Sequence, residues 1–243
     1  MRIVKGETWG LIPARGGSKS IPLKNLAAFA GRPLIDHVVL AAQASGRASR
    51  LICSTDSPEI KARCRELGVE PHDRPAELGQ DETPVIDVIA HLLRDLAARD
   101  GAVAEFIALL QPTSPFLLPA HIDAAVDALV ADREAGSAQT VVPCPHNHHA
   151  INQRIIADGH VAFRFADDRA QAYNKQRKAP HFLFGNLLVF RAEAALAQHA
   201  PFATPSLPVE IPFHYGFDLD GPDDIRFGEA LLAAGLVALP HLA

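Results

Sequence analysis

The chain has 243 residues, of which 48% are hydrophobic and 21% are charged, and its formal net charge is −5 at pH 7. This length and balance are typical of one globular α/β domain, and they exclude a disordered or fibrous chain. The negative net charge excludes the broad basic surface by which many proteins bind nucleic acid. Any phosphate ligand must therefore be held by a local cluster of positive charges and backbone N–H groups.

Three features of the sequence indicate the cellular compartment of the protein. No apolar run approaches the roughly 18 residues that a membrane-spanning helix needs, and the N-terminal segment is too short and too polar for a signal peptide. Cys53, Cys64 and Cys144 are odd in number and far apart, which favours a reducing environment. We therefore expect a cytoplasmic protein that does not bind the membrane.

Strands and helices alternate through the first half of the chain. Apolar runs predict strands at 10–14, 49–54, 106–110 and 140–143. Start signals and helical periodicity predict helices at 34–44, from Ser57-Pro58 to Gly68, from Thr83-Pro84 through Leu96, and at 121–130. This alternation predicts a doubly wound, mostly parallel sheet of the Rossmann-like kind.

The pattern changes after Pro143. Two short runs, 151–156 and 160–165, flank Asp158-Gly159, which is the sequence signal of a type I′ hairpin. A basic segment at 173–178 follows. We expect one domain over 1–243 with an inserted hairpin and basic segment at about 146–190. The remaining predicted elements are strands at 182–190 and 213–219 and a helix at 223–234.

The segment after the first predicted strand carries a phosphate-binding signal. Gly16-Gly17 allows close approach of the backbone, with N–H groups facing an anion. Arg15 and Lys19 flank the glycines and can neutralise a triphosphate at the strand end where open α/β sheets bind ligands. Ser18 stands where a P-loop requires its second glycine, so the segment is not of that kind. Taken alone, it is also compatible with a tight turn that carries solvated charges.

Two further segments carry polar groups that suit a nucleotide. Lys24 adds a positive charge, and the amide of Asn25 is able to read a base edge. The segment Gln111–Pro115 leaves a buried strand as a rigid polar turn, at the height where such sheets bind ligands. The alternative for each is an ordinary loop or helix cap.

Asp218 and Asp220 form a candidate metal site. Two residues apart on the predicted strand at 213–219, they should project to one face. Neighbouring carboxylates repel unless a cation lies between them, and their oxygens suit Mg²⁺, which also binds phosphate. The alternative is a solvated strand end before a helix whose dipole favours Asp223 and Asp224.

The run His146-Asn147-His148-His149 offers several imidazoles. Without a second set of ligands, such a cluster is more typical of a solvated loop than of a metal centre.

Five segments, in this order, resemble the CMP-sugar synthetases, which are the acylneuraminate and Kdo-type cytidylyltransferases. The matches span residues 11 to about 228, which is nearly the whole chain. The first is an almost gapless match to the family signature A-R-G-G-S-K-x-I-P-x-K-N. The matching segments are residues 14–25, Ser54-Thr55-Asp56-Ser57, residues 74–83, Gln111–Pro115 and Asp218-Leu219-Asp220.

The resemblance implies transfer of CMP from CTP to an acidic sugar with release of pyrophosphate. It implies Mg²⁺ at Asp218 and Asp220, catalytic roles for Arg15 and Lys19, and a homodimer in which the hairpin reaches the partner's site. The sugar would lie beside Gln111 and Ser114, and Lys175 and Arg177 are candidates for its carboxylate. The nucleotide-binding residues implied are Ala14, Arg15, Gly16, Gly17, Ser18, Lys19, Lys24, Asn25, Arg74, Asp81, Thr83 and Gln111.

One segment departs from the family pattern. Many members carry N-G-A-[IV]-Y-[IV] where this chain has Phe-Gly-Asn-Leu-Leu-Val-Phe at 184–190. The acceptor therefore stays open between sialic-acid-like and Kdo-like sugars, and a non-sugar acid such as a phosphonate is an alternative. A second alternative is a nucleotide-binding regulatory protein without turnover. The presence of Lys19, Asp218 and Asp220 argues against it.

Overall fold

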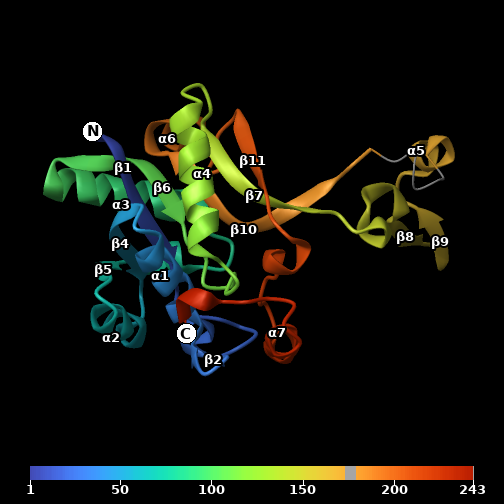
Figure 1. The fold of residues 1–243 in the computed structure, drawn as a ribbon, viewed down its shortest axis with the longest axis horizontal. Coiled ribbons are helices and arrows are strands. Elements are labelled where there is room, and N and C mark those ends of the chain that lie inside the picture. The colour runs from blue at the N-terminus through green and yellow to red at the C-terminus, as the bar shows by residue number, and fades with distance from the viewer. Residues whose placement is uncertain (173–178, 243) are drawn as a thin grey trace.

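The fold is described by a computed structural model that covers residues 1–172 and 179–242. Within this described part, the centre is a 7-stranded sheet with the order β11-β7-β10-β6-β1-β4-β5 (Figure 1). Its strands are β1 (Arg2–Pro13), β4 (Ala48–Thr55), β5 (Glu70–Asp73), β6 (Ala102–Leu109), β7 (Ser137–Pro143), β10 (Phe182–Arg191) and β11 (Ser206–Glu210).

The sheet is mostly parallel, which confirms the prediction. β1 pairs in parallel with β4 and β6, β4 pairs with β5, and β7 pairs with β11, whereas β10 is antiparallel to β6 and β7. The edge strands β5 and β11 were not predicted from the sequence. Each is short and contains a proline, Pro71 or Pro208, which an edge strand tolerates because one side of its backbone needs no partner.

Helices cover both faces of the sheet. Residues of α1 (Leu34–Ser45), α2 (Pro58–Glu66) and α4 (Pro119–Ala131) are buried on one face, and residues of α3 (Val85–Asp100) and α6 (Ala192–Gln198) on the other. The neighbours Leu11 and Ile12 of β1 belong to opposite clusters. Burial on both faces explains the continuous apolar runs of the strands and confirms a doubly wound sheet. Among the described residues, no helix is both long enough and apolar enough to cross a lipid bilayer.

The starts of α2 and α3 differ from each other, although their sequence signals look alike. Ser57 caps α2, because its Oγ accepts a hydrogen bond from the Ile60 N–H at 3.3 Å. Thr83 does not cap α3, and its hydroxyl instead donates to the carbonyl of Glu77 at 3.3 Å. Thr83 therefore does not act as a helix cap, although α3 begins directly after Pro84, as the sequence predicts.

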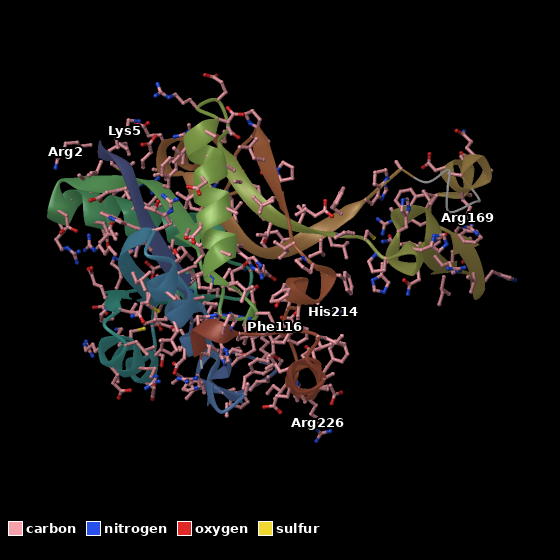
Figure 2. The ribbon with its side chains drawn as sticks, in the orientation of Figure 1. Arg2, Lys5, Phe116, Arg169, His214 and Arg226 are labelled. Atoms are coloured by element: carbon pink, nitrogen blue, oxygen red, sulfur yellow. The ribbon has the colours of Figure 1, made fainter. Side chains whose placement is uncertain are left out.

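The predicted hairpin exists and stands apart from the main sheet. β8 (Arg154–Ala157) and β9 (His160–Phe163) form a separate antiparallel pair, and Figure 1 shows it projecting from the body together with α5 (Ala166–Gln171). Asp158 and Gly159 have φ values of 50° and 76°, as a type I′ turn requires. Figure 2 shows Arg169 within this projecting part. The basic residues Lys175 and Arg177 lie outside the described residues.

The prediction of a strand at 213–219 is wrong. Residues Phe213–Gly216 form a short 3-10 helix after Pro212, and an extended loop leads from there to α7 (Pro222–Ala233). The apolar residues of this stretch are explained by burial in the core and not by strand formation. Leu219 is buried in a small cluster with Phe29 and with Phe116, which Figure 2 labels, so side-chain packing rather than strand pairing explains the pattern.

Candidate active site

The segment after β1 lines a pocket of about 390 Å³ at the carboxyl ends of β1 and β6. This is the edge at which parallel sheets bind ligands. The pocket brings together the N-terminal segment, the turn after β6 and the loop before α7. Its lining residues are Pro13, Arg15, Ser18, Lys19, Ser20, Lys24, Asn25, Asp81, Gln111, Pro112, Thr113 and Asp220.

Asp81 holds the two cations that are predicted to bind phosphate. Arg15 Nη1 lies 2.5 Å from Asp81 Oδ1, and Lys19 Nζ pairs with the other carboxylate oxygen. Hydrogen bonds from Lys19 and Arg15 lower the pKa of Asp81 below its ordinary value. The carboxylate thus occupies the position of an anion between two cations, and a triphosphate that binds both has to replace it.

The glycine pair is held by a residue that the sequence analysis did not select as a site residue. The N–H of Gly16 donates to Asp56 Oδ1 at 2.7 Å, so a carboxylate of the chain itself occupies this N–H. A Cβ on Gly16 would lie 2.9 Å from the Cβ of Ser57, which explains why glycine is required here. Asp56 falls inside the motif Ser54–Ser57, so the signal for it was present in the sequence.

Asn25 and Lys24 connect the N-terminal segment to its surroundings. The buried Asn25 donates through Nδ2 to the carbonyl of Arg15 at 2.9 Å, which fixes the start of the glycine turn. Lys24 Nζ donates to the carbonyl of Leu219 at 3.1 Å and lies 3.3 Å from Asp220 Oδ1. Lys24 therefore joins the predicted phosphate segment to the acidic pair, across almost the full length of the chain.

The acidic pair lies on the extended loop before α7, so the premise of a shared strand is wrong. The alternation survives without a strand, because Leu219 turns into the core while Asp218 and Asp220 are exposed. Desolvation raises the pKa of Asp218, a hydrogen bond with Thr113 opposes this, and the charge of Asp220 adds to it. Desolvation of the Asp218 carboxyl group is therefore the main cause of its raised pKa, and the charge of Asp220 is a smaller one.

Asp224 supports this loop. Its Oδ2 accepts hydrogen bonds from the N–H groups of Asp220 at 2.9 Å and of Gly221 at 2.7 Å. These contacts cap the start of α7. Asp224 is one of the two acidic residues that the sequence placed at the favoured start of this helix.

Six predicted nucleotide or sugar residues within the described part of the chain do not line the pocket, namely Ala14, Gly16, Gly17, Arg74, Thr83 and Ser114. Arg74 is buried and donates to the hydroxyl of Ser54 at 3.2 Å and to its carbonyl at 2.8 Å, and burial lowers the pKa of Arg74. Thr83 bonds to a neighbouring backbone, and Ser114 is buried under the turn, where its N–H donates to the carbonyl of Gln111 at 3.0 Å. In this structure Arg74, Thr83 and Ser114 support the segments that form the pocket.

The histidine run is not gathered into a metal site. His149 is buried, its Nε2 lies 3.0 Å from the carbonyl of Ala179, and its ring stacks on His181 with centroids 3.9 Å apart. Within the described part of the chain, no three metal-ligating side chains of this run come together. The run forms a short 3-10 helix, His146–His148, and the buried His149 follows it, so the expectation of a wholly solvated loop is not met.

Comparison with known proteins shows the family to which the chain belongs. A family model described as "Cytidylyltransferase" matches residues 9–197, which include the phosphate segment and the turn after β6. The chain belongs to the cytidylyltransferase family. This agrees with the resemblance of the five sequence segments.

Characterised relatives in this family are similar over parts of their length. An N-acylneuraminate cytidylyltransferase of Oncorhynchus mykiss is 35% identical over 63% of this chain and 33% of its own. A CMP-N,N'-diacetyllegionaminic acid synthase of Legionella pneumophila is 39% identical over 48% of this chain and 50% of its own. An N-acylneuraminate cytidylyltransferase of Streptococcus agalactiae is 27% identical over 88% of this chain and 50% of its own length. The chain thus spans a third to a half of the length of these relatives.

Solved structures agree with the fold over nearly the whole chain. CMP:2-keto-3-deoxy-manno-octonic acid synthetase, in complex with CTP, superposes with a TM-score of 0.70 at 16% identity and covers 94% of this chain and 99% of its own. A 4-diphosphocytidyl-2C-methyl-D-erythritol synthase superposes with a TM-score of 0.67 at 14% identity. The match covers 94% of this chain and 99% of the synthase. At these identities the comparison shows a shared nucleotidyltransferase fold.

Proposed function

We propose that the protein transfers CMP from CTP to the hydroxyl of an acidic sugar and releases pyrophosphate. The observation that carries the proposal is the pocket at the carboxyl edge of the sheet, which is lined by Arg15, Lys19 and Lys24 together with Asp81 and Asp220. Three cations around one pocket suit a triphosphate, and membership of the cytidylyltransferase family supports the choice of CTP. The names of the relatives support an acceptor of the sialic-acid or Kdo kind.

Nucleotidyl transfer depends mainly on positioning the two substrates and on neutralising the charge of the phosphates. The acceptor hydroxyl attacks the α-phosphorus of CTP, its proton is lost, and the bond to the leaving pyrophosphate breaks. Arg15 and Lys19 would leave Asp81, bind the phosphates and stabilise the charge that develops on pyrophosphate. Asn25 and Gln111 line the same pocket and are the candidates to contact the base.

The acidic pair fits a magnesium ion by its donor chemistry. Mg²⁺ binds carboxylate and phosphate oxygens, and Asp218 and Asp220 place two carboxylates on one short loop, where a cation would relieve their negative charge. We infer that Asp218 and Asp220 would hold the ion. When bound, Mg²⁺ would polarise phosphate oxygens and lower the pKa of the attacking hydroxyl. Lys24 would keep Asp220 in place before the ion binds.

A homodimer is part of the proposal. The projecting hairpin leaves Ile156 79% exposed and Val161 68% exposed, which is costly for a pair of strands that faces only water. A second copy of the chain is the partner expected to cover them. We predict a particle of twice the chain mass by light scattering, and a monomer for Ile156→Asp. An unchanged mass for that variant would contradict a contact through the hairpin.

The direct test is pyrophosphate release with CTP, Mg²⁺ and a panel of acidic acceptors, with the product read by the mass of the CMP adduct. CTP should be preferred to UTP, because a site that bonds the 4-amino group keeps an unpaired polar group with UTP. The cost is about 1–3 kcal/mol per buried group, or about 5- to 150-fold in kcat/KM. Equal kcat/KM for the two nucleotides would contradict the assignment. A product with a phosphonate and with no sugar would favour the non-sugar alternative.

A further inference from the structure

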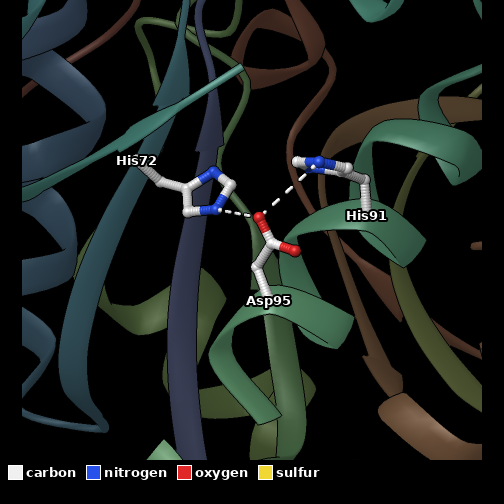
Figure 3. A group of neighbouring side chains, drawn as sticks. All are labelled: His72, His91 and Asp95. Carbon is white, nitrogen blue, oxygen red and sulfur yellow. Dashed lines mark hydrogen bonds and ion pairs between the residues drawn. The ribbon is translucent and has the colours of Figure 1, made fainter. Parts of the chain in front are cut away.

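Outside the pocket, three side chains with metal-binding groups meet between the edge strand β5 and α3. His72 comes from β5, and His91 and Asp95 lie one helical turn apart on α3 (Figure 3). His72 Nε2 lies 3.1 Å from Asp95 Oδ2, and His91 Nε2 lies 3.6 Å from the same oxygen. The three ligand atoms all lie within 4.8 Å of one another.

These separations fit one metal ion. Zn²⁺ binds histidine nitrogen and carboxylate oxygen at about 2.0–2.2 Å, and in a tetrahedron two ligand atoms are then about 3.4 Å apart. The two measured distances to Asp95 lie on either side of that value, so an ion is accommodated with small changes of rotamer. A pocket of about 440 Å³ opens beside His72 and Asp95 and offers space for a water as the fourth ligand.

The chemistry of the donors selects the class of ion. Imidazole suits Zn²⁺ and its neighbours in the first transition series, whereas Mg²⁺ prefers oxygen ligands. We propose that His72, His91 and Asp95 form a binding site for a transition-metal ion, with Zn²⁺ as its natural occupant. The site is separate in composition from the all-oxygen pair Asp218 and Asp220, so the two sites should take different metals.

The position of the ligands in the chain indicates what the ion would do. His72 precedes, and His91 follows, the segment that carries Asp81, the partner of Arg15 and Lys19. An ion bound to β5 and α3 would tie the two ends of this segment together. It binds the folded chain and has no assembled site in the unfolded one, so it should stabilise the fold.

The test uses the full chain without an affinity tag, in excess Mg²⁺ so that oxygen sites are filled. Zn²⁺ binding is measured by calorimetry and Co²⁺ binding by the visible absorption of a tetrahedral ion. Both are compared for the wild type, His91→Ala and Asp95→Asn. His91 and Asp95 lie on the outer part of α3, so both variants should fold, which circular dichroism without metal checks. The matched control is His199→Ala, because His199 Nε2 also faces a carboxylate of α3, Asp87, at 3.3 Å but, within the described residues, belongs to no group of three metal-ligating side chains.

The wild type and His199→Ala should bind about one Zn²⁺ more per chain than His91→Ala or Asp95→Asn. Only the first two should show the Co²⁺ absorption. At a metal concentration of 100 times Kd, their melting temperature should rise by about 5–10 °C. Equal stoichiometry, absorption and thermal shift in all four proteins would overturn the proposal. In that case the three side chains would form only a cluster of hydrogen bonds.

Discussion

Lys19→Ala should lower kcat at saturating CTP by about 10²–10³-fold, which is the usual cost of losing one preorganised group that stabilises developing charge. Its stability should be unchanged, because the Lys19 side chain is 85% exposed and its pairing with Asp81 is a surface contact. The loss in kcat arises because one of the cations that neutralise the leaving pyrophosphate is absent. Pyrophosphate release and a thermal melt on the same sample measure both effects.

Lys5→Ala is the matched control for this prediction. Lys5 is also an exposed lysine paired with a carboxylate, Glu105, at 3.7 Å, and Figure 2 shows it near the N-terminal end of β1, away from the pocket. This variant should keep wild-type kcat and melting temperature. If Lys19→Ala were as active as Lys5→Ala, Lys19 would have no role in phosphate binding.

Asp218→Asn and Asp220→Asn should each remove Mg²⁺-dependent activity and leave the melting temperature nearly unchanged or slightly raised. Loss of a residue behind a metal ligand costs about 10–100-fold, so loss of a direct ligand should cost more than about 100-fold. The neutral amide removes the cost of desolvating the Asp218 charge, which is the main cause of its raised pKa, and also the smaller repulsion from Asp220. Asp220→Asn loses the pair with Lys24, and because the Asp220 side chain is 80% exposed, this loss should cost little stability. Titration of pyrophosphate release with Mg²⁺ and a thermal melt separate the two effects.

Asp224→Ala is the control for a merely structural role. Asp224 accepts the hydrogen bonds that cap α7, so its removal should cost about 0.5–2 kcal/mol of stability. For a chain of this length that is a fall in melting temperature of about 1–8 °C. Variants of Asp218 and Asp220 that melted early, like Asp224→Ala, and kept their activity would contradict the metal site and much of the proposed mechanism.

The sequence by itself determined the architecture, because the relevant signals are local. The apolar stripe of α3 follows the helical period, the strand β6 is apolar on both faces, and Asp158-Gly159 adopts the positive φ angles that its turn requires. The phosphate segment and its place at the carboxyl edge of the sheet followed in the same way. Each of these features depends on neighbours within a few residues.

Only the tertiary structure decided how distant charges meet. Asp81 bridges Arg15 and Lys19, Asp56 takes the N–H of Gly16, and Lys24 reaches Asp220 across almost the whole chain. The stretch at 213–219 looks like a strand because its side chains alternate. However, that alternation comes from packing of Leu219 against Phe29 and Phe116 in the core.

The meeting of His72, His91 and Asp95 was likewise visible only in the tertiary structure. Two of its members are one helical turn apart, a spacing visible in the sequence, but the third comes from a short edge strand that local pattern did not predict. Local propensity specifies the elements, since it acts through neighbouring backbone and side chains. Contacts between elements depend on how the sheet and helices pack, and the roles of single side chains in both sites were therefore decided by the fold.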